Sequence, residues 1–326
     1  MNRRTIAILL SGLCSVAAAS CGQQGDSDHA RDTAAPHLAN ARSTADNGVL
    51  LRLNLPKGPV PVLQYDIDQK IQETIQGHTL NIHQVISMGM AADVLGTDAA
   101  GNMNVRFTFR SLKQTMESPG VKASSQLQDK LSRALVGKSY DAMIDARGHV
   151  GSITGLDKVM DAVITAINLP PGPQATAIES TLKQNFGESA MKENLSRMLA
   201  TYPEKPVHVG DSWPVTQSIS HPYPMTVNTH YRLVSVSGGL TKLVLDSTLA
   251  TTPGASMAIG TTKTKLTMKG TQTGTESLDT KTGWVRDSKL QQNLSGSISV
   301  AVPGRQQELS IPMTIQSTIT INSLKK

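Results

Sequence analysis

The stretch VLQYDIDQKIQETI, residues 62–75, alternates apolar and polar side chains along most of its length. Leu63, Tyr65, Ile67, Ile71 and Ile75 fall on odd positions, with Gln, Asp and Lys between them. Successive side chains of a β-strand point to opposite faces, so this spacing predicts a strand with one dry face and one wet face. The chain is therefore expected to build a sheet that is packed on one side.

The same period continues beyond a turn at Gln76-Gly77-His78. A second run spans residues 80–94, and after GTDAAGN a third run spans residues 103–109. Three strands of this length predict a broad antiparallel meander with one dry side.

Helical spacing replaces alternation in the middle of the chain. Apolar residues recur every three or four positions in residues 124–137, 156–167 and about 175–199, and a short hairpin lies between the first two of these segments at 140–153. The three predicted helices are amphipathic, so they are expected to lie against the dry face of the sheet. Strand-like alternation returns from YPEKPVHVGDSWPV (residues 202–215) onward, which gives an α+β chain with helices between two meanders.

The N-terminus has the three parts of a secretory signal: Arg3 and Arg4, an apolar run at residues 6–16, and small side chains at 17–20. Cys21 follows directly, and the arrangement resembles the lipobox of bacterial lipoproteins, in which this thiol is diacylated. We expect residues 1–20 to be a lipoprotein signal peptide, 21–50 a flexible tether and 51–326 a single α+β domain. The tether assignment follows from the scarcity of large apolar side chains there.

The lipobox resemblance is incomplete at one position. Ala18 stands where the motif usually has Leu, so an ordinary cleaved signal with an incidental Cys21 remains the alternative. Cys14 lies inside the signal, so a mature chain that begins at Cys21 has no cysteine pair for an internal disulfide. Gly22 follows the cysteine in place of Asp, which by resemblance to enterobacterial sorting favours a lipid anchor in the outer membrane, facing the periplasm.

Composition argues against nucleic-acid binding. The chain carries a formal charge of +6 from 31 Lys and Arg against 25 Asp and Glu, but the basic residues are scattered. Only ten aromatic residues are present (three Phe, two Trp, five Tyr), too few for stacking platforms along a basic groove.

Several short motifs resemble a family of bacterial lipoproteins known only as a domain of unknown function. They are GDSW at 210–213, IDARGHVGSITGLD at 144–157, LDTKTGWV at 278–285 and the start at Cys21, and the resemblance covers roughly residues 50–325. More distantly, two meanders with inserted helices are similar to the half-barrel of lipoprotein-localisation factors. That similarity implies a curved antiparallel sheet, a half-barrel, with about three helices packed on its concave face, and a lipid or lipoprotein acyl chain as ligand.

Methionine is the unusual ingredient of the predicted dry face. Flexible thioethers suit an adaptable apolar pocket, although they also fill gaps where large aromatics are scarce. The candidate ligand-lining residues are Met88, Met90, Met103, Phe107, Phe109, Met268 and Met313.

No catalytic, metal or cofactor site is expected. The chain contains no HExxH, CxxC or glycine-rich phosphate loop. His78 and His83 lie an odd number of residues apart, which places them on opposite faces of a strand. Asp211 is expected to make a turn that presents Trp213 as an apolar anchor, rather than to serve Ser212 in a hydrolase triad.

Two functional hypotheses remain at this point. The first is a lipid-anchored envelope protein that binds or carries an apolar ligand, which requires an apolar pocket above roughly 300 Å³. The second is a structural or assembly lipoprotein with a packed core and unspecified protein partners. An enzyme is not expected.

Overall fold

The computed structural model describes residues 48–119, 121–122, 125–168, 172–199, 202–220, 224–259, 262–300 and 308–324. The predicted signal, Cys21 and nearly all of the predicted tether lie outside these residues. Alternating side chains form two groups of strands with the helices between them. The first group is β1 (Gly58–Ile75), β2 (His78–Thr97), β3 (Met103–Ser118), β4 (Val121–Lys122), β5 (Ser139–Ile144) and β6 (Val150–Thr154). The second is β7 (Ser212–Ile219), β8 (Met225–Ser237), β9 (Leu240–Thr251), β10 (Ser256–Ile259), β11 (Thr262–Asp279), β12 (Val285–Val300) and β13 (Leu309–Leu324).

The two groups form one antiparallel sheet of 13 described strands. Its main path runs β6-β5-β3-β2-β1-β13-β12-β11-β9-β8-β7, with β4 added to β3 and β10 to β11. The first and last long strands make the junction, where Tyr65 lies opposite Ile321 and Ile71 opposite Ile315. The fold is therefore mostly β, and the sheet is open, ending at β6 and β7.

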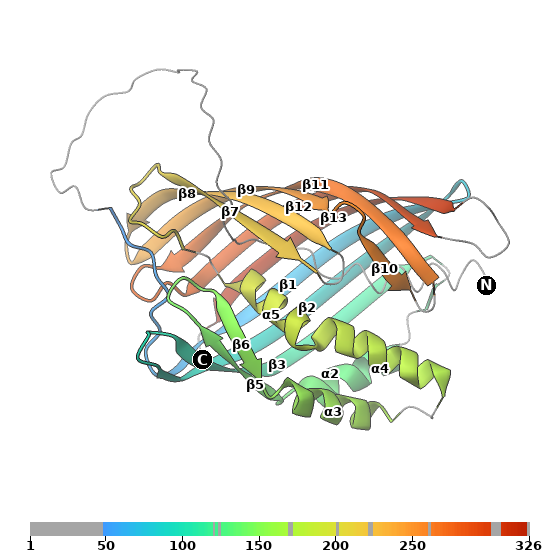
Figure 1. The fold of residues 1–326 in the computed structure, drawn as a ribbon, viewed down its shortest axis with the longest axis horizontal. Helices are drawn as coiled ribbons and strands as arrows, with labels where there is room; N and C mark the ends of the chain where they lie inside the picture. The colour runs from blue at the N-terminus through green and yellow to red at the C-terminus, as the bar shows by residue number, and fades with distance from the viewer. Residues whose placement is uncertain are drawn as a thin grey trace, which may run out of the picture.

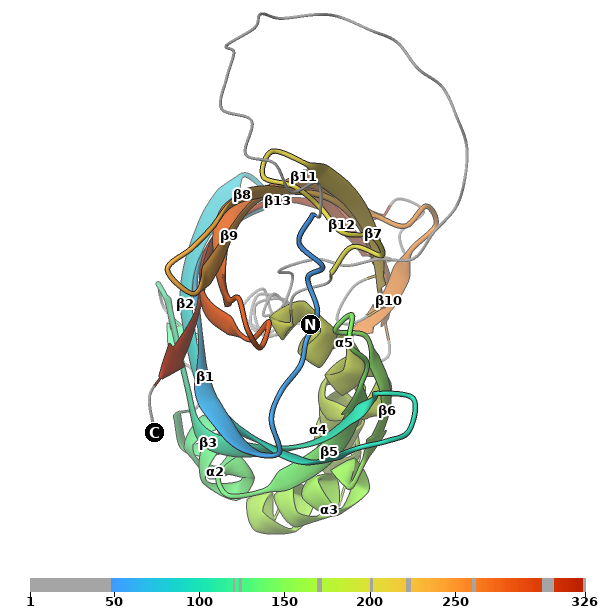
Figure 2. The ribbon, with the colours of Figure 1, turned by 90° about the vertical axis from the view of Figure 1, so that its left-hand side faces the viewer.

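Figure 1 shows the long strands of both groups running side by side, with the helices gathered along one side of the molecule. The sheet is strongly curved in Figure 2, and α5 (Glu188–Met198) lies between the end strands β6 and β7. The other helices are α2 (Ser125–Leu135), α3 (Leu156–Ile167) and α4 (Pro173–Phe186).

The single helix expected over residues 175–199 is wrong in one respect, because the segment forms two helices. Gly187 separates α4 from α5 with extended backbone angles, φ −67° and ψ 170°. Its N–H still donates to the Lys183 carbonyl at 2.8 Å, but a Cβ at this position would run into the same carbonyl group. The apolar spacing continues through the break, which is why periodicity alone joined the two helices.

Two predicted turns are confirmed. Gly148 (φ 85°) closes the turn that begins at Asp145, and Gly283 (φ 71°) closes the one that begins at Asp279. In both turns the Asp carboxylate also accepts backbone N–H groups, as short Asp side chains do in turns.

Alternation gives the sheet a buried face and an exposed face. On β1 the odd-numbered side chains from Leu63 to Glu73 are buried. The apolar side chains of the buried face form two clusters. The first cluster joins α2–α5 to one end of the strands and includes Leu63, Phe107, Val163, Leu195 and Trp284. The second cluster lies farther along the strands and includes Ile71, Ile82, Met225, Leu266, Met268, Leu294, Ile311 and Met313.

Candidate functional site: the buried face of the sheet

The seven candidate ligand-lining residues all lie on the buried face but do not form one site. Met88 is half-buried and the other six are buried. Met268 and Met313 belong to the second cluster. The remaining five, Met88, Met90, Met103, Phe107 and Phe109, belong to the first cluster.

Several candidate residues of the first cluster are packed against other side chains of the core. The ring of Phe107 stacks on Tyr140 of β5 with centroids 5.6 Å apart, and Phe109 lies 5.9 Å from the same ring. The sulfur of Met103 accepts the Leu55 N–H at 3.4 Å. These residues act as packing partners of the core, which is the gap-filling role considered for methionine.

A row of polar side chains divides the two apolar clusters. Its members are uncharged, and each lies directly opposite the next on seven neighbouring strands from β2 to β8. All are buried, with 0–4% of each residue exposed. We call this set the polar row; it consists of Gln84, Gln69, Ser317, Gln292, Gln272, Ser247 and Thr229.

Hydrogen bonds within the polar row use only part of its capacity. Gln69 Nε2 donates to Ser317 Oγ at 3.2 Å, and Gln292 Nε2 donates to Gln272 Oε1 at 3.2 Å. Among the described residues, Gln69 Oε1, Gln292 Oε1 and Gln272 Nε2 have no hydrogen-bond partner. Each buried polar atom left in this way costs about 1–3 kcal/mol, so these three amide groups leave the row partly unsatisfied between two apolar surfaces.

The polar row was not predicted from the sequence. Gln69 interrupts an apolar series on β1 between Ile67 and Ile71, and this interruption is the available signal in the sequence. Its significance depends on Gln272 and Gln292, which lie about 200 residues away and meet it only through strand register.

Two buried carboxyl groups flank the polar row on opposite sides. Glu73, 0% exposed, lies opposite Leu80 and Met313, and Glu276, 6% exposed, lies opposite Leu243 and Ser288. Burial raises the pKa of Glu73 to about 7. Burial, with a smaller contribution from Asp287, raises the pKa of Glu276 to about 7. Both groups are therefore about half protonated near neutral pH.

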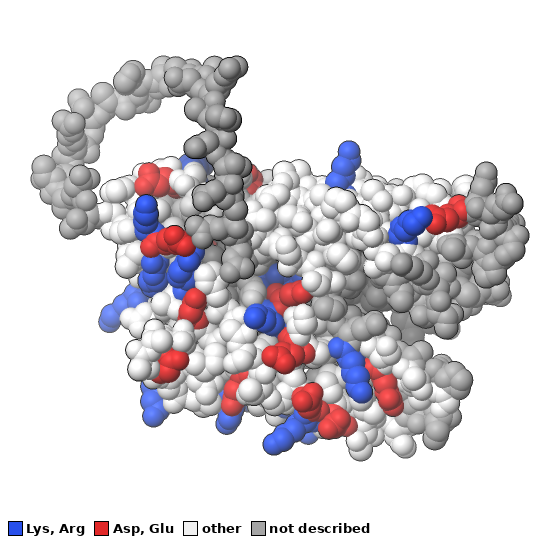
Figure 3. Space-filling model, viewed as in Figure 1, with Lys and Arg blue, Asp and Glu red and all other residues white. Residues whose placement is uncertain are grey.

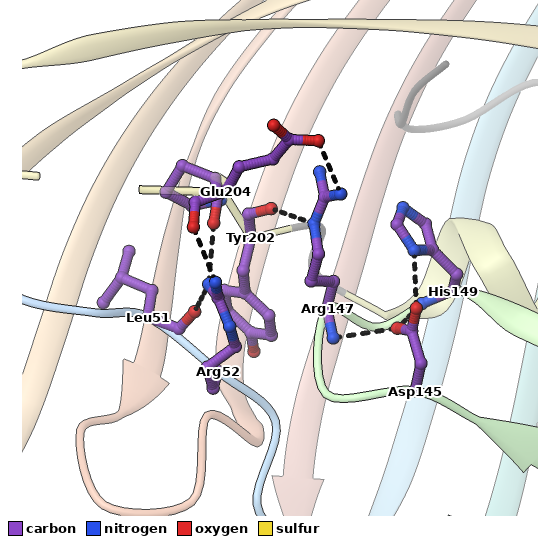
Figure 4. Close-up of polar contacts among 8 residues, drawn as sticks. Leu51, Arg52, Asp145, Arg147, His149, Tyr202 and Glu204 are labelled. Carbon is purple, nitrogen blue, oxygen red and sulfur yellow. Dashed lines mark hydrogen bonds and ion pairs between the residues drawn. The ribbon is translucent and has the colours of Figure 1, made fainter. Parts of the chain in front are cut away.

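Arg52, Arg147 and Glu204 form a group of polar contacts at one end of the sheet, which we call the clamp (Figure 4). Arg52, just before β1, donates to the carbonyls of Leu51, Pro203 and Glu204, each at 2.7 Å. Arg147, in the β5–β6 turn, contacts the Glu204 carboxylate at 3.0 Å. The neighbouring backbone adds bonds from Leu53 N–H to Ala146 and from Asn54 N–H to Thr282, each at 2.8 Å. The clamp joins the segment that enters β1 to both strand groups.

The GDSW motif has the structural role expected for it. The Asp211 carboxylate accepts the His208 N–H at 2.8 Å, which forms a turn. Trp213 is buried and stacks on Tyr231 with centroids 5.6 Å apart. Asp211 therefore positions an apolar anchor of the first cluster.

Two hollows are described in the structure, and the larger one reaches the strand segments next to Gln69, Gln84 and Ser317 of the polar row. The larger one, of about 800 Å³, lies over β1, β2, β3 and β13, and its lining combines Ile71 and Ile82 of the second cluster with polar side chains that include Lys70, His83 and Glu117. A smaller one of about 170 Å³ lies between α3 and α4. Both hollows have a mixed lining of apolar and polar side chains.

Charged groups on the face drawn in Figure 3 are of both signs and intermixed. Within the described ranges, no group of three or more His, Cys, Asp or Glu residues is placed to hold a metal ion. No described helix is both long enough and apolar enough to cross a membrane. His221, one of the histidines in the sequence, lies outside the described residues.

The fold defines a mostly β protein with an open antiparallel sheet and helices inserted between its two strand groups. Residues 100–285 match the model of DUF6263, a family of unknown function, and the chain belongs to this family. A search of curated proteins gave no match.

Two solved structures have low similarity to this chain. The first is described as lipid-protein interactions in lipovitellin, with a TM-score of 0.38 and 9% identity; the match covers 83% of this chain and 26% of that one. The second is the β domain of the Bordetella autotransporter BrkA, with a TM-score of 0.20 and 8% identity; it covers 81% of this chain and 100% of that one.

Proposed function

We propose that this protein is a lipid-anchored bacterial cell-envelope protein that binds an apolar ligand on the buried face of its sheet. In this proposal the curved sheet is a half-barrel, its concave side is the buried face, and the helices cover part of that side. One observation carries the proposal: β1 pairs with β13, which joins both strand groups into one continuous face bearing two apolar clusters. Such a face suits hydrocarbon, because burying apolar area is favourable wherever it comes from.

The ligand is tested by native mass spectrometry of the full-length protein purified from its host membrane. We expect a mass adduct that organic extraction removes and that fragments as a lipid. Leu294→Trp, in the second cluster, should displace the adduct by filling the space it needs. Asn293→Trp is the matched control, because the neighbouring side chain on β12 is exposed. Circular dichroism shows whether each variant folds, and Met313→Phe replaces Leu294→Trp if that variant does not.

A lipid-free protein from the host membrane would contradict ligand binding. The alternative would then be a structural or assembly lipoprotein without a ligand cavity. The hollow over β1, β2, β3 and β13 supports this alternative, because Lys70 and Glu117 in its lining offer a protein partner both charge signs.

The anchor is tested separately at the cysteines. Cys21→Ser should move the protein from the membrane pellet to the soluble fraction and abolish labelling with a radioactive fatty acid, whereas Cys14→Ser should change neither. Gly22→Asp should shift the protein towards inner-membrane fractions of a sucrose gradient. A wild-type protein that is soluble and unlabelled would instead support an ordinary cleaved signal.

A further inference from the structure

The polar row lies between the two apolar clusters on every strand that it crosses. Gln69 on β1 lies between Ile67 and Ile71, and Gln292 on β12 lies between Leu290 and Leu294. On six of the seven strands, the next residue of the buried face belongs to the first cluster on one side and to the second cluster on the other; on β11 the neighbours of Gln272 are Gly270 and Gly274. A ligand that contacts both clusters must therefore cross the row.

The row contains atoms that can still form hydrogen bonds. Gln69 and Gln292 each keep an oxygen, and Gln272 keeps an NH₂ group, without a partner among the described residues. All three side chains are buried, with 3%, 1% and 0% exposed. Buried amide groups are nearly always paired in proteins, so these adjacent amide groups are suited to bind a polar group of a ligand.

The polar row suits an uncharged polar group. The polar row consists of Gln, Ser and Thr side chains and supplies no charge to balance an ionic headgroup. Moving an unpaired phosphate or carboxylate into such a place costs far more than moving a neutral amide or hydroxyl group. Because the row offers both acceptors and donors, a group that both donates and accepts satisfies it best.

We propose that the ligand is a neutral lipid with an amide or hydroxyl group between two hydrocarbon parts, and that this group binds Gln69, Gln272 and Gln292. This inference rests on the proposed function. The hydrocarbon parts then lie against the two clusters, and the polar row selects lipids by the position of their polar group. A simple hydrocarbon would leave the row unsatisfied.

Three probes of similar length test the inference: N-dodecyldodecanamide, dodecyl dodecanoate and the corresponding alkane. Delipidated full-length protein is given each probe from cyclodextrin, and binding is measured by displacement of a fluorescent, uncharged long-chain amide. We expect the amide to bind at least about tenfold more tightly than the alkane, which corresponds to roughly 1.4 kcal/mol. The ester, which only accepts, should lie between them.

Gln272→Leu/Gln292→Leu should remove the preference for the amide while retaining alkane binding. The matched control is Thr271→Val/Asn293→Leu, because these residues lie opposite each other on the same two strands with exposed side chains. If Gln272→Leu/Gln292→Leu does not fold, Gln69→Leu on β1 replaces it and should likewise reduce the preference for the amide.

The outcomes separate the inference from the proposed function. Two results would overturn the inference and leave ligand binding intact. One is equal binding of amide and alkane to the wild type, and the other is an unchanged amide preference in Gln272→Leu/Gln292→Leu. The first of these results would mean that ordered water satisfies the row. Failure to bind any of the three probes overturns the inference and the proposed function together.

Discussion

Gln292 on β12 donates its Nε2 hydrogen to Gln272 Oε1 on β11 at 3.2 Å, and almost none of either residue is exposed. Removing one partner of a buried pair leaves the other unsatisfied, whereas removing both does not. Gln292→Leu should therefore lower the free energy of unfolding of the ligand-free protein by about 1–3 kcal/mol, and Gln272→Leu/Gln292→Leu should lower it less. Urea unfolding measures both values. A double variant as unstable as the sum of the two single variants would contradict this account.

Glu73 should make stability depend on pH. Burial raises the pKa of its carboxyl group from 4.5 to about 7, so the folded state holds the proton over a range where the unfolded state has lost it. The contribution of Glu73 to the free energy of unfolding is therefore fully present below pH 4.5 and is lost as the pH rises towards 7.

Glu73→Gln removes that loss, because a neutral amide replaces the carboxylate. The variant should gain up to about 3 kcal/mol relative to wild type between pH 5 and pH 8. Thermal melts at a series of pH values provide the measurement. Glu117→Gln, at an exposed carboxylate on β3, should show no such trend. A constant difference between Glu73→Gln and wild type at every pH would mean that Glu73 does not titrate in this range.

Gly283 is predicted to be intolerant of any side chain. Its φ is +71°, and a Cβ there would collide with the Arg52 carbonyl and lie 2.9 Å from the Tyr202 hydroxyl oxygen. Gly254 has a similar φ of +77° with nothing within 4 Å of the same position, so it isolates the cost of the backbone angle. Gly254→Ala should cost about 1 kcal/mol and Gly283→Ala about 2–4 kcal/mol. Equal losses in chemical denaturation would exclude the collision.

The clamp residue Arg52 is predicted to hold the segment that enters β1. Its guanidinium reaches three carbonyls on two segments, a geometry that a lysine ammonium cannot reproduce. Arg52→Ala should speed proteinase K cleavage near residues 48–57 several-fold, and Arg52→Lys should recover only part of the protection. Arg232→Ala, on the exposed face of β8, is the control. Unchanged cleavage in Arg52→Ala would show that the backbone bonds alone hold this segment.

The sequence correctly predicted local features of the structure, such as strand faces and turns. The alternation in residues 62–75 correctly placed Leu63, Tyr65, Ile67 and Ile71 on the buried face, because side-chain direction in a strand depends only on parity. The Asp and Gly residues of the 145–148 and 279–283 turns were equally predictive, since they satisfy backbone geometry within a few residues. The break at Gly187 was not found, because the apolar spacing of α4 continues into α5.

Alternation alone predicted which side chains are buried, but not which of them lie next to one another in the folded sheet. Met88 and Met313 share a face yet belong to different clusters, and Gln69 meets Gln272 and Gln292 in one row only after β1 pairs with β13 and β13 with β12. Strand register depends on hydrogen bonds between segments far apart in the chain, and a shift of a single residue would turn the polar-row side chain of that strand to the opposite face. The row is therefore a product of long-range pairing, and no window of the sequence contains it.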